Sequence, residues 1–209
     1  MIAFCDGGCT GNGKSNACAS FATIVVAQNE IIEIYGKVID REYLLVSDSL
    51  QTNNTYVKPS NNRGEMLAII HTLMELLKHV DTDATAKIAS DATAKVASDA
   101  TFEIISDSQI CLNTLLTWLR TRLAKGTERE MKNFDLVMIA WNLYKRFNGT
   151  CKLTHTRGHL KAPVSSSTRD KMIFEGNKRV DKLASYAIEN SSSELNINRY
   201  VRTSCESIW

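Results

Sequence analysis

The first 27 residues, MIAFCDGGCTGNGKSNACASFATIVVA, decide between two possible folds, one with a phosphate-binding loop and one with a β-hairpin. Gly8 to Ser15 matches the phosphate-binding pattern G-x-x-x-x-G-K-[ST], which works between a strand and the N-terminus of a helix. The chain after Ser15 does not favour a helix, because the β-branched run at 23–26 is typical of a strand. We therefore interpret residues 11–13 as the turn of a hairpin, and we keep a P-loop phosphotransferase that uses Gly8–Ser15 as an alternative.

Outward from this hairpin, the apolar pattern indicates both strands and helices. Helical spacing is clearest from Gly64 to Val80, whereas short runs rich in Ile, Val and Phe predict strands. We expect strands at 2–5, 20–27, 30–38, 102–106 and 151–156, helices at 64–80, 108–123, 133–147 and 178–188, and a loop at 47–62. This order predicts an α/β domain with a mixed sheet.

A short repeat lies in the middle of the chain. DATAKIAS (83–90) and DATAKVAS (91–98) precede the related DATFEIIS (99–106). Three short copies are too few for a solenoid, so we interpret them as a duplicated lead-in to a strand, carried as a surface insertion at about 81–100. Only Asp107, which follows the third copy, is succeeded by a helical pattern.

Composition indicates a globular chain with one main domain. Of the 209 residues 44% are apolar, and the net charge is +2. We expect a domain at 1–190 with a long loop at 160–176, and a loosely held polar tail at 191–209. Asp6 interrupts the first apolar run, so we expect no export signal, and no apolar run is long enough to span a membrane, so we expect no membrane partner. We expect an intracellular monomer, in the cytoplasm or else in the nucleoid or nucleus. Two segments, 157–182 and 120–132, are locally basic, which suits phosphate binding and equally suits a solvated surface.

Four carboxylates lie at the expected ends or first turns of these elements. Asp6 follows the first strand, Glu65 starts the first long helix, Asp107 follows the strand 102–106, and Asp181 lies in the last helix. Singly, each is better explained as a helix cap or a surface charge. Together they can converge at one end of a sheet, and hard oxygen ligands of this kind suit a pair of Mg²⁺ ions.

The residues around these carboxylates resemble the successive motifs of the type 1 ribonuclease H family, in the family's order. The resemblance covers about residues 1–188, and its motifs are Asp6-Gly-Gly-Cys-Thr-Gly-Asn12, Asn61-Asn-Arg-Gly-Glu65, Ser106-Asp-Ser-Gln109, Arg157-Gly-His159 and Asn177-Lys-Arg-Val-Asp181. It implies an RNase H-like fold, a five-stranded mixed sheet with three antiparallel strands, then two parallel ones, flanked by helices. It also implies an endonuclease that hydrolyses the RNA strand of RNA–DNA hybrids and leaves 3′-hydroxyl and 5′-phosphate ends.

The resemblance also implies roles for individual residues. Asp6, Glu65, Asp107 and Asp181 would hold two Mg²⁺ ions, or Mn²⁺, and His159 would assist proton transfer or product release. Contacts to the hybrid would come from six residues, Cys9, Asn12, Asn61, Asn62, Gln109 and Asn177. Such contacts read sugar and shape, so little sequence preference is expected.

The chain departs from the family pattern in several places, two of which concern the site. The spacing from His159 to Asp181 is longer than the family usually shows, and we expect the insert to form a flexible flap. Gly64 stands before Glu65 where a bulkier residue is common, and we expect it to loosen the start of the helix. The remaining alternative is a nucleic-acid-binding protein of the same fold without catalysis. Such a protein usually lacks one of the carboxylates, and all four are present here.

Overall fold

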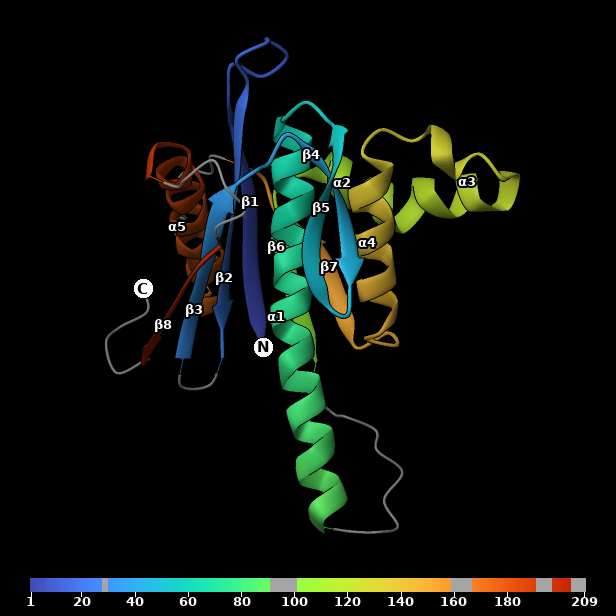
Figure 1. The fold of residues 1–209 in the computed structure, drawn as a ribbon. Helices are drawn as coiled ribbons and strands as arrows, with labels where there is room; N and C mark the ends of the chain where they lie inside the picture. Colours follow the sequence, from blue (N-terminus) through green and yellow to red (C-terminus); the bar gives the residue numbers. More distant parts are fainter. Residues whose placement is uncertain (28–29, 91–100, 159–166, 191–196, 204–209) are drawn as a thin grey trace.

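The computed structural model describes residues 1–209 apart from 28–29, 91–100, 159–166, 191–196 and 204–209, and it describes 81–90 by backbone only (Figure 1). The strands are β1 Ile2–Thr10, β2 Cys18–Val26, β3 Glu30–Lys37, β4 Arg41–Val46, β5 Ser49–Tyr56, β6 Phe102–Ser106, β7 Cys151–His155 and β8 Asn198–Thr203. The helices are α1 Asn61–Ser90, α2 Gln109–Asn113, α3 Leu119–Lys125, α4 Phe134–Lys145 and α5 Thr168–Asn190, with a π-helical turn at Thr114–Trp118 and a 3₁₀ turn at Glu128–Glu130. No helix in these described ranges is long and apolar enough to cross a membrane.

The main sheet is mixed, as expected, and has the order β7-β6-β1-β2-β3-β8. β1, β2 and β3 pair antiparallel, while β1, β6 and β7 pair parallel. The sixth strand, β8, is a correction, because it lies in the segment expected to be a loose tail and pairs antiparallel with β3. The polar sequence of this segment did not indicate a strand. Its side chains Arg199 and Arg202 form ion pairs with the buried carboxylates of Glu75 and Glu33.

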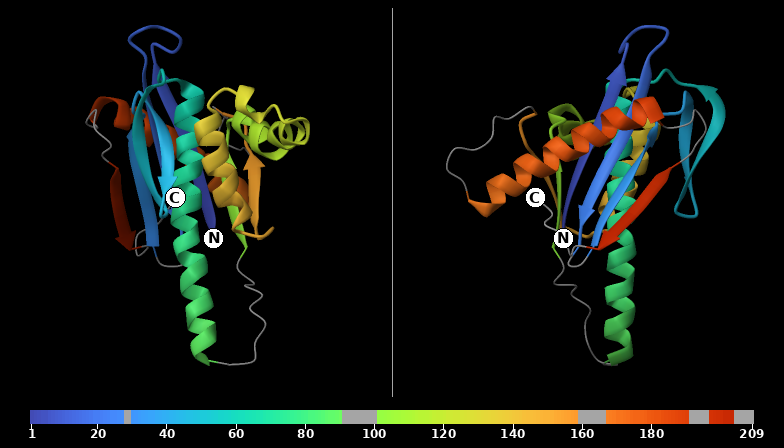
Figure 2. Two further views of the ribbon diagram at one scale, coloured as in Figure 1. Left: turned by 45° about the vertical axis from the view of Figure 1, so that its right-hand side comes forward. Right: turned by 90° about the vertical axis from the view of Figure 1, so that its left-hand side faces the viewer.

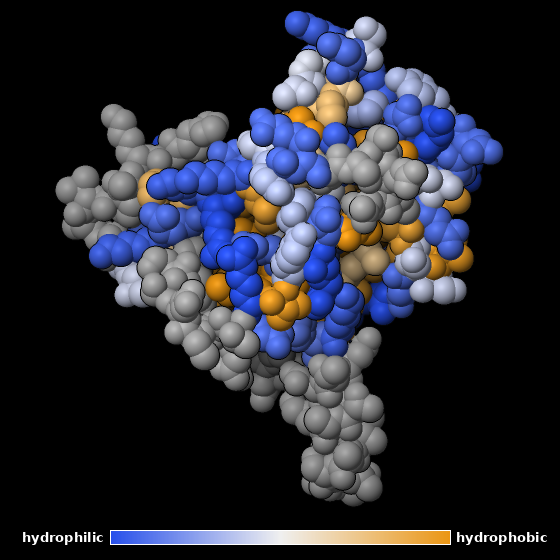
Figure 3. All heavy atoms as spheres, turned by 60° about the vertical axis from the view of Figure 1, so that its left-hand side comes forward, coloured by the Kyte–Doolittle hydropathy of each residue, from blue (hydrophilic) through white to orange (hydrophobic). Residues whose placement is uncertain are grey.

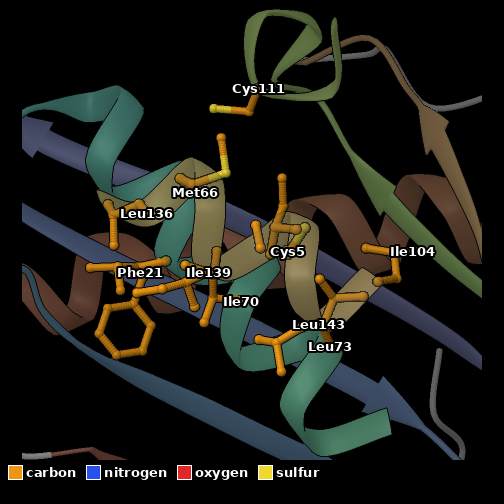
Figure 4. Close-up of a cluster of buried hydrophobic side chains, with 14 of the residues drawn as sticks. Cys5, Phe21, Met66, Ile70, Leu73, Ile104, Cys111, Leu136, Ile139 and Leu143 are labelled. Atoms are coloured by element: carbon orange, nitrogen blue, oxygen red, sulfur yellow. The ribbon is translucent and has the colours of Figure 1, made fainter. Parts of the chain in front are cut away.

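Helices cover both faces of the sheet (Figures 1 and 2). α1 and α4 pack together on one face, where Ile70, Leu73, Ile139 and Leu143 belong to the larger hydrophobic cluster (Figure 4). α5 crosses the other face and closes a smaller cluster around Phe4. The side of the molecule that carries α5 is covered mainly by hydrophilic side chains, with apolar ones showing between them (Figure 3).

Half of the segment 47–62 is a strand, β5, rather than a loop, which corrects the expectation from its polar sequence. β5 pairs with β4 in a separate two-stranded sheet, joined by a turn at Ser47 and Asp48. Both turn residues have positive φ (48° and 60°), as a two-residue hairpin turn requires. Only Leu50 of β5 is buried, so the strand lacks the apolar alternation by which it would be recognised.

Two helices are longer than their apolar patterns predicted. α1 continues through the first repeat copy to Ser90, because Ala, Lys and Ile in DATAKIAS are compatible with a helix. The second copy lies outside the described residues, and the third ends in β6. α5 begins at Thr168, so the later part of the expected 160–176 loop is helical.

Candidate active site

A cleft opens beside β1, where its partner strand ends. β1 pairs with β2 from Ile2 to Thr10, but its parallel pairing with β6 stops at Cys5↔Ser106. Asp6 is the next residue of β1, and Asp107 is the next residue after β6. The sequence suggested that Asp6 follows the first strand, but the structure places it inside β1. It faces the cleft because β6 no longer pairs with β1 at this position.

The third carboxylate reaches the cleft because α1 approaches the sheet very closely. A Cβ atom on Gly7 would lie 2.2 Å from the backbone nitrogen of Glu65, and one on Gly64 would lie 2.2 Å from the backbone oxygen of Ser20. Neither position has room for a side chain. Gly64 thus permits the contact of the helix start with β2, which corrects the expectation that it loosens this helix.

A buried ion pair fixes the first turn of α1 from the other side. The Arg63 guanidinium, 1% exposed, donates to both carboxylate oxygens of Asp135 in α4, at 2.9 and 2.7 Å. It also donates to the backbone oxygen of Arg41 at 3.0 Å, and the backbone amide of Tyr43 donates to Asp135. The helix start that carries Glu65 is therefore joined to both α4 and β4.

The carboxylates of Asp6, Glu65 and Asp107 converge. Each offers one oxygen, and these oxygens lie within 4.8 Å of one another. Burial, followed by the charges of Asp107 and Asp181, raises the pKa of Asp6 from 3.8 to about 7. Burial and the charges of Asp6 and Asp107 also raise the pKa of Glu65, whose Oε2 is buried without a hydrogen-bond partner. Such a cluster of hard oxygen donors fits divalent cations.

Asp181 lines the same cleft, outside the group of converging oxygens. The cleft has a volume of about 510 Å³, and α5 forms one wall of it with Phe174, Asn177, Lys178 and Asp181. Asn177 is 9% exposed, and its Oδ1 has no hydrogen-bond partner. Phe174 and Lys178 were missed in the sequence, since Phe174 falls in the segment expected to be a loop and a single lysine in a helix carries no signal.

The residues expected to contact substrate fall into two groups. Cys9, Asn12 and Asn61 lie together, because Asn12 Oδ1 accepts hydrogen bonds from the thiol of Cys9 (3.7 Å) and the backbone amide of Asn61 (3.4 Å). The side chain of Asn61 also donates to Glu65 Oε1 at 3.3 Å, which links this group to the carboxylates.

The other predicted residues lie apart from that group. Gln109 is exposed and donates to Asn113, and Asn62 lines a separate cavity with Met66 and Trp118. His159 lies outside the described residues. The chain passes close to Asp107 just before it, since a Cβ on Gly158 would lie 2.6 Å from Asp107 Oδ2.

The phosphate-binding alternative does not have the structure it needs. Residues 11–17 form the turn between β1 and β2, and the backbone amide of Lys14 donates to the oxygen of Gly11. β2 follows directly at Cys18, so no helix N-terminus stands behind the G-K-S sequence. The P-loop interpretation of Gly8–Ser15 is therefore wrong.

Comparison with known proteins gives a family and a fold. The family model described as RNase H matches residues 1–189. Among solved structures, "LC9-RNase H1, a type 1 RNase H with the type 2 active-site motif" has a TM-score of 0.55 at 11% identity, covering 95% of this chain and 76% of that one.

Two further solved structures are similar. The foamy viral protease-reverse transcriptase in complex with dsDNA has a TM-score of 0.53 at 10% identity, covering 90% of this chain and 92% of that one. The PFV RNase H domain has a TM-score of 0.51 at 13% identity, covering 91% and 95%. No curated protein matches. At these identities the likeness shows the fold alone.

Proposed function

Because this chain belongs to the ribonuclease H family, we propose that it is an endonuclease that hydrolyses the RNA strand of RNA–DNA hybrids. The observation that carries the proposal is the convergence of Asp6, Glu65 and Asp107 within 4.8 Å, with Asp181 in the same cleft. A structural role does not explain this cluster, since burial and the neighbouring negative charges raise the pKa of Asp6 and of Glu65 and make the ionised cluster unfavourable without a cation.

The four carboxylates would hold two divalent ions, Mg²⁺ or Mn²⁺. The unpartnered Oε2 of Glu65 and the all-oxygen donor set support this assignment. When bound, such ions supply activation of the attacking water and stabilisation of the leaving 3′-oxygen, giving 3′-hydroxyl and 5′-phosphate products. The protein's own part is to hold the carboxylates rigidly, through the Gly7–Gly64 contact and the Arg63–Asp135 pair.

Recognition of the RNA strand would fall to the polar residues beside the cleft. Cys9, Asn12 and Asn61 form one connected group that ends on Glu65, and Asn177 offers a free acceptor to a hydroxyl group. An acceptor for the 2′-hydroxyl is what distinguishes RNA from DNA. Gln109 and His159 keep the roles that the family resemblance implies, as hybrid contact and as an aid to proton transfer or product release.

The test is cleavage of a labelled RNA–DNA hybrid with Mg²⁺ or Mn²⁺. We expect the wild type to cut the RNA strand, Asp107→Asn to lose at least about a hundredfold in rate because a metal ligand is removed, and Asp99→Asn to cut normally. Asp99 opens the third repeat copy and is the matched control. An intact RNA strand with the wild-type protein would contradict the proposal and favour a binding protein without catalysis.

A further inference from the structure

One wall of the carboxylate cleft carries a positive charge. Phe174 and Lys178 lie one turn apart on α5, and both line the cleft with Asp6 and Asp181. The Lys178 ammonium lies 5.6 Å from the centre of the Phe174 ring, which is a cation–π distance. Lys178 is exposed, and this contact favours a position of its ammonium beside the ring that lines the cleft.

The first turns of α5 are fixed in place, so this wall is a defined part of the site. Ser167 caps the helix: its hydroxyl accepts from the backbone amide of Asp170 at 3.2 Å and donates to the carboxylate of Asp170 at 2.9 Å. In the same turn, Arg169 Nη2 donates to both carboxylate oxygens of Glu103 in β6, at 2.8 Å each. α5 therefore cannot swing away from β6 without breaking a paired set of hydrogen bonds.

Further along α5, Gly176 brings the helix down onto β1. A Cβ at this position would lie 2.4 Å from the Phe4 ring, so the backbone of α5 rests directly on that ring. Gly176 stands between Phe174 and Asn177, and both line the cleft. The close contact between Gly176 and Phe4 therefore fixes the distance of α5 from β1, which carries Asp6.

The charges around the cleft leave a role for Lys178. Of the described residues that line it, four are carboxylates and Lys178 is the only cation. Two divalent ions would balance the four carboxylates, and a phosphodiester entering the cleft adds one negative charge. The ion pairs among the described residues do not include Lys178, so its ammonium is available to meet that charge.

We propose that Lys178 binds a phosphate of the RNA strand at this cleft and that Phe174 is a positioning residue for its ammonium. The inference rests on the proposed function, because it takes the RNA strand of a hybrid as the ligand. It adds a substrate-binding wall contributed by the early turns of α5. The neighbouring Asn177, with its unpartnered Oδ1, would contact the sugar of the same nucleotide.

The test compares Lys178→Gln with Lys182→Gln. Lys182 is an exposed lysine one turn further along α5 that does not line the cleft, so it controls for the loss of charge from the helix. Binding of a labelled hybrid is measured as a function of salt in an Asp107→Asn background, so that no cleavage occurs. We expect Lys178→Gln to weaken binding about tenfold and to reduce the slope of log Kd against log salt by about 1, with Lys178→Arg retaining the slope.

Kinetics in the otherwise unchanged protein separate binding from chemistry. Lys178→Gln should raise KM about tenfold with kcat within about twofold, and Phe174→Leu should raise KM by a smaller factor without changing the salt slope. If the wild type cleaves and Lys178→Gln matches Lys182→Gln in binding slope and KM, this inference is wrong while the proposed function stands. If the wild type neither cleaves nor binds hybrids, both are wrong.

Discussion

Replacing Asp6 by Asn should stabilise the metal-free protein and strongly reduce its stabilisation by metal. Asp6 is 7% exposed, and burial together with its acidic neighbours raises its pKa from 3.8 to about 7. At about 1.4 kcal/mol for each pKa unit, that rise corresponds to about 4 kcal/mol lost from folding when the carboxyl is ionised. Asn keeps the shape and can still accept the 2.8 Å hydrogen bond from the Gly7 amide, so the variant removes the charge alone.

The direction in which stability changes with pH depends on whether the native or the unfolded state binds more protons at Asp6. Below about pH 4 Asp6 is protonated in both states and costs nothing. Between about pH 4 and 7 the native state binds more protons than the unfolded state, so stability falls as pH rises, and above 7 the loss is complete. The advantage of Asp6→Asn should therefore grow from near zero at pH 4 to at most about 4 kcal/mol at pH 8.

Urea unfolding in EDTA, repeated at several pH values, measures this difference directly. Asp48→Asn is the control, since Asp48 is an exposed turn residue with φ of 60°, a conformation that Asn accepts, and its surface pair with Arg146 contributes at most about 1 kcal/mol. Millimolar Mg²⁺ should raise the melting temperature of the wild type and of Asp48→Asn by similar amounts. The increase for Asp6→Asn should be much smaller. An Asp6→Asn protein no more stable than the wild type at pH 8 in EDTA would refute the reasoning.

Three other predictions concern the frame around the site. Gly64→Ala should destabilise the fold by about 1–3 kcal/mol and lower hybrid cleavage, because its Cβ meets the Ser20 backbone oxygen; unchanged thermal melting and activity would contradict this. Burial lowers the pKa of His71, which stacks on Phe21, to about 4, so the stability that urea unfolding measures for the wild type relative to His71→Phe should fall as pH drops from about 6.5 to 4. The comparison cancels the opposite contribution of Asp6, which both proteins share, and identical acid profiles of the two proteins would argue against it. Ending the chain at residue 196 should lower the melting temperature and cause concentration-dependent association in light scattering, since the edge of β3 is uncovered; a monomer of normal stability would count against this.

Much of the frame could be predicted from the sequence, because its strands and helices bury apolar residues with the right period. The strands 2–5 and 102–106 and the carboxylates that follow them are of this kind. β5 and β8 could not be predicted in this way. β5 is largely exposed. β8 forms ion pairs with Glu33 and Glu75, which lie far from it in the sequence.

The candidate site shows the same division. Four carboxylates were predicted to converge because each was expected at the end or first turn of an element. The structure places oxygens of Asp6, Glu65 and Asp107 within 4.8 Å of one another, and Asp181 lines the same cleft outside that group. The wall formed by Phe174 and Lys178 was not predicted, since it depends on where α5 begins. That start is set by Ser167 and by a partner, Glu103, on another strand.

The order in which the chain leaves the ribosome gives β8 a further significance. β3 is complete early in synthesis, whereas the strand that covers its edge comes from residues 198–203, after every other element of the sheet has been made. Until those residues have been made, a nascent chain carries an open edge on β3, and neighbouring chains on one message can join through it. Slow translation between the codons for β3 and those for β8 would prolong that exposure.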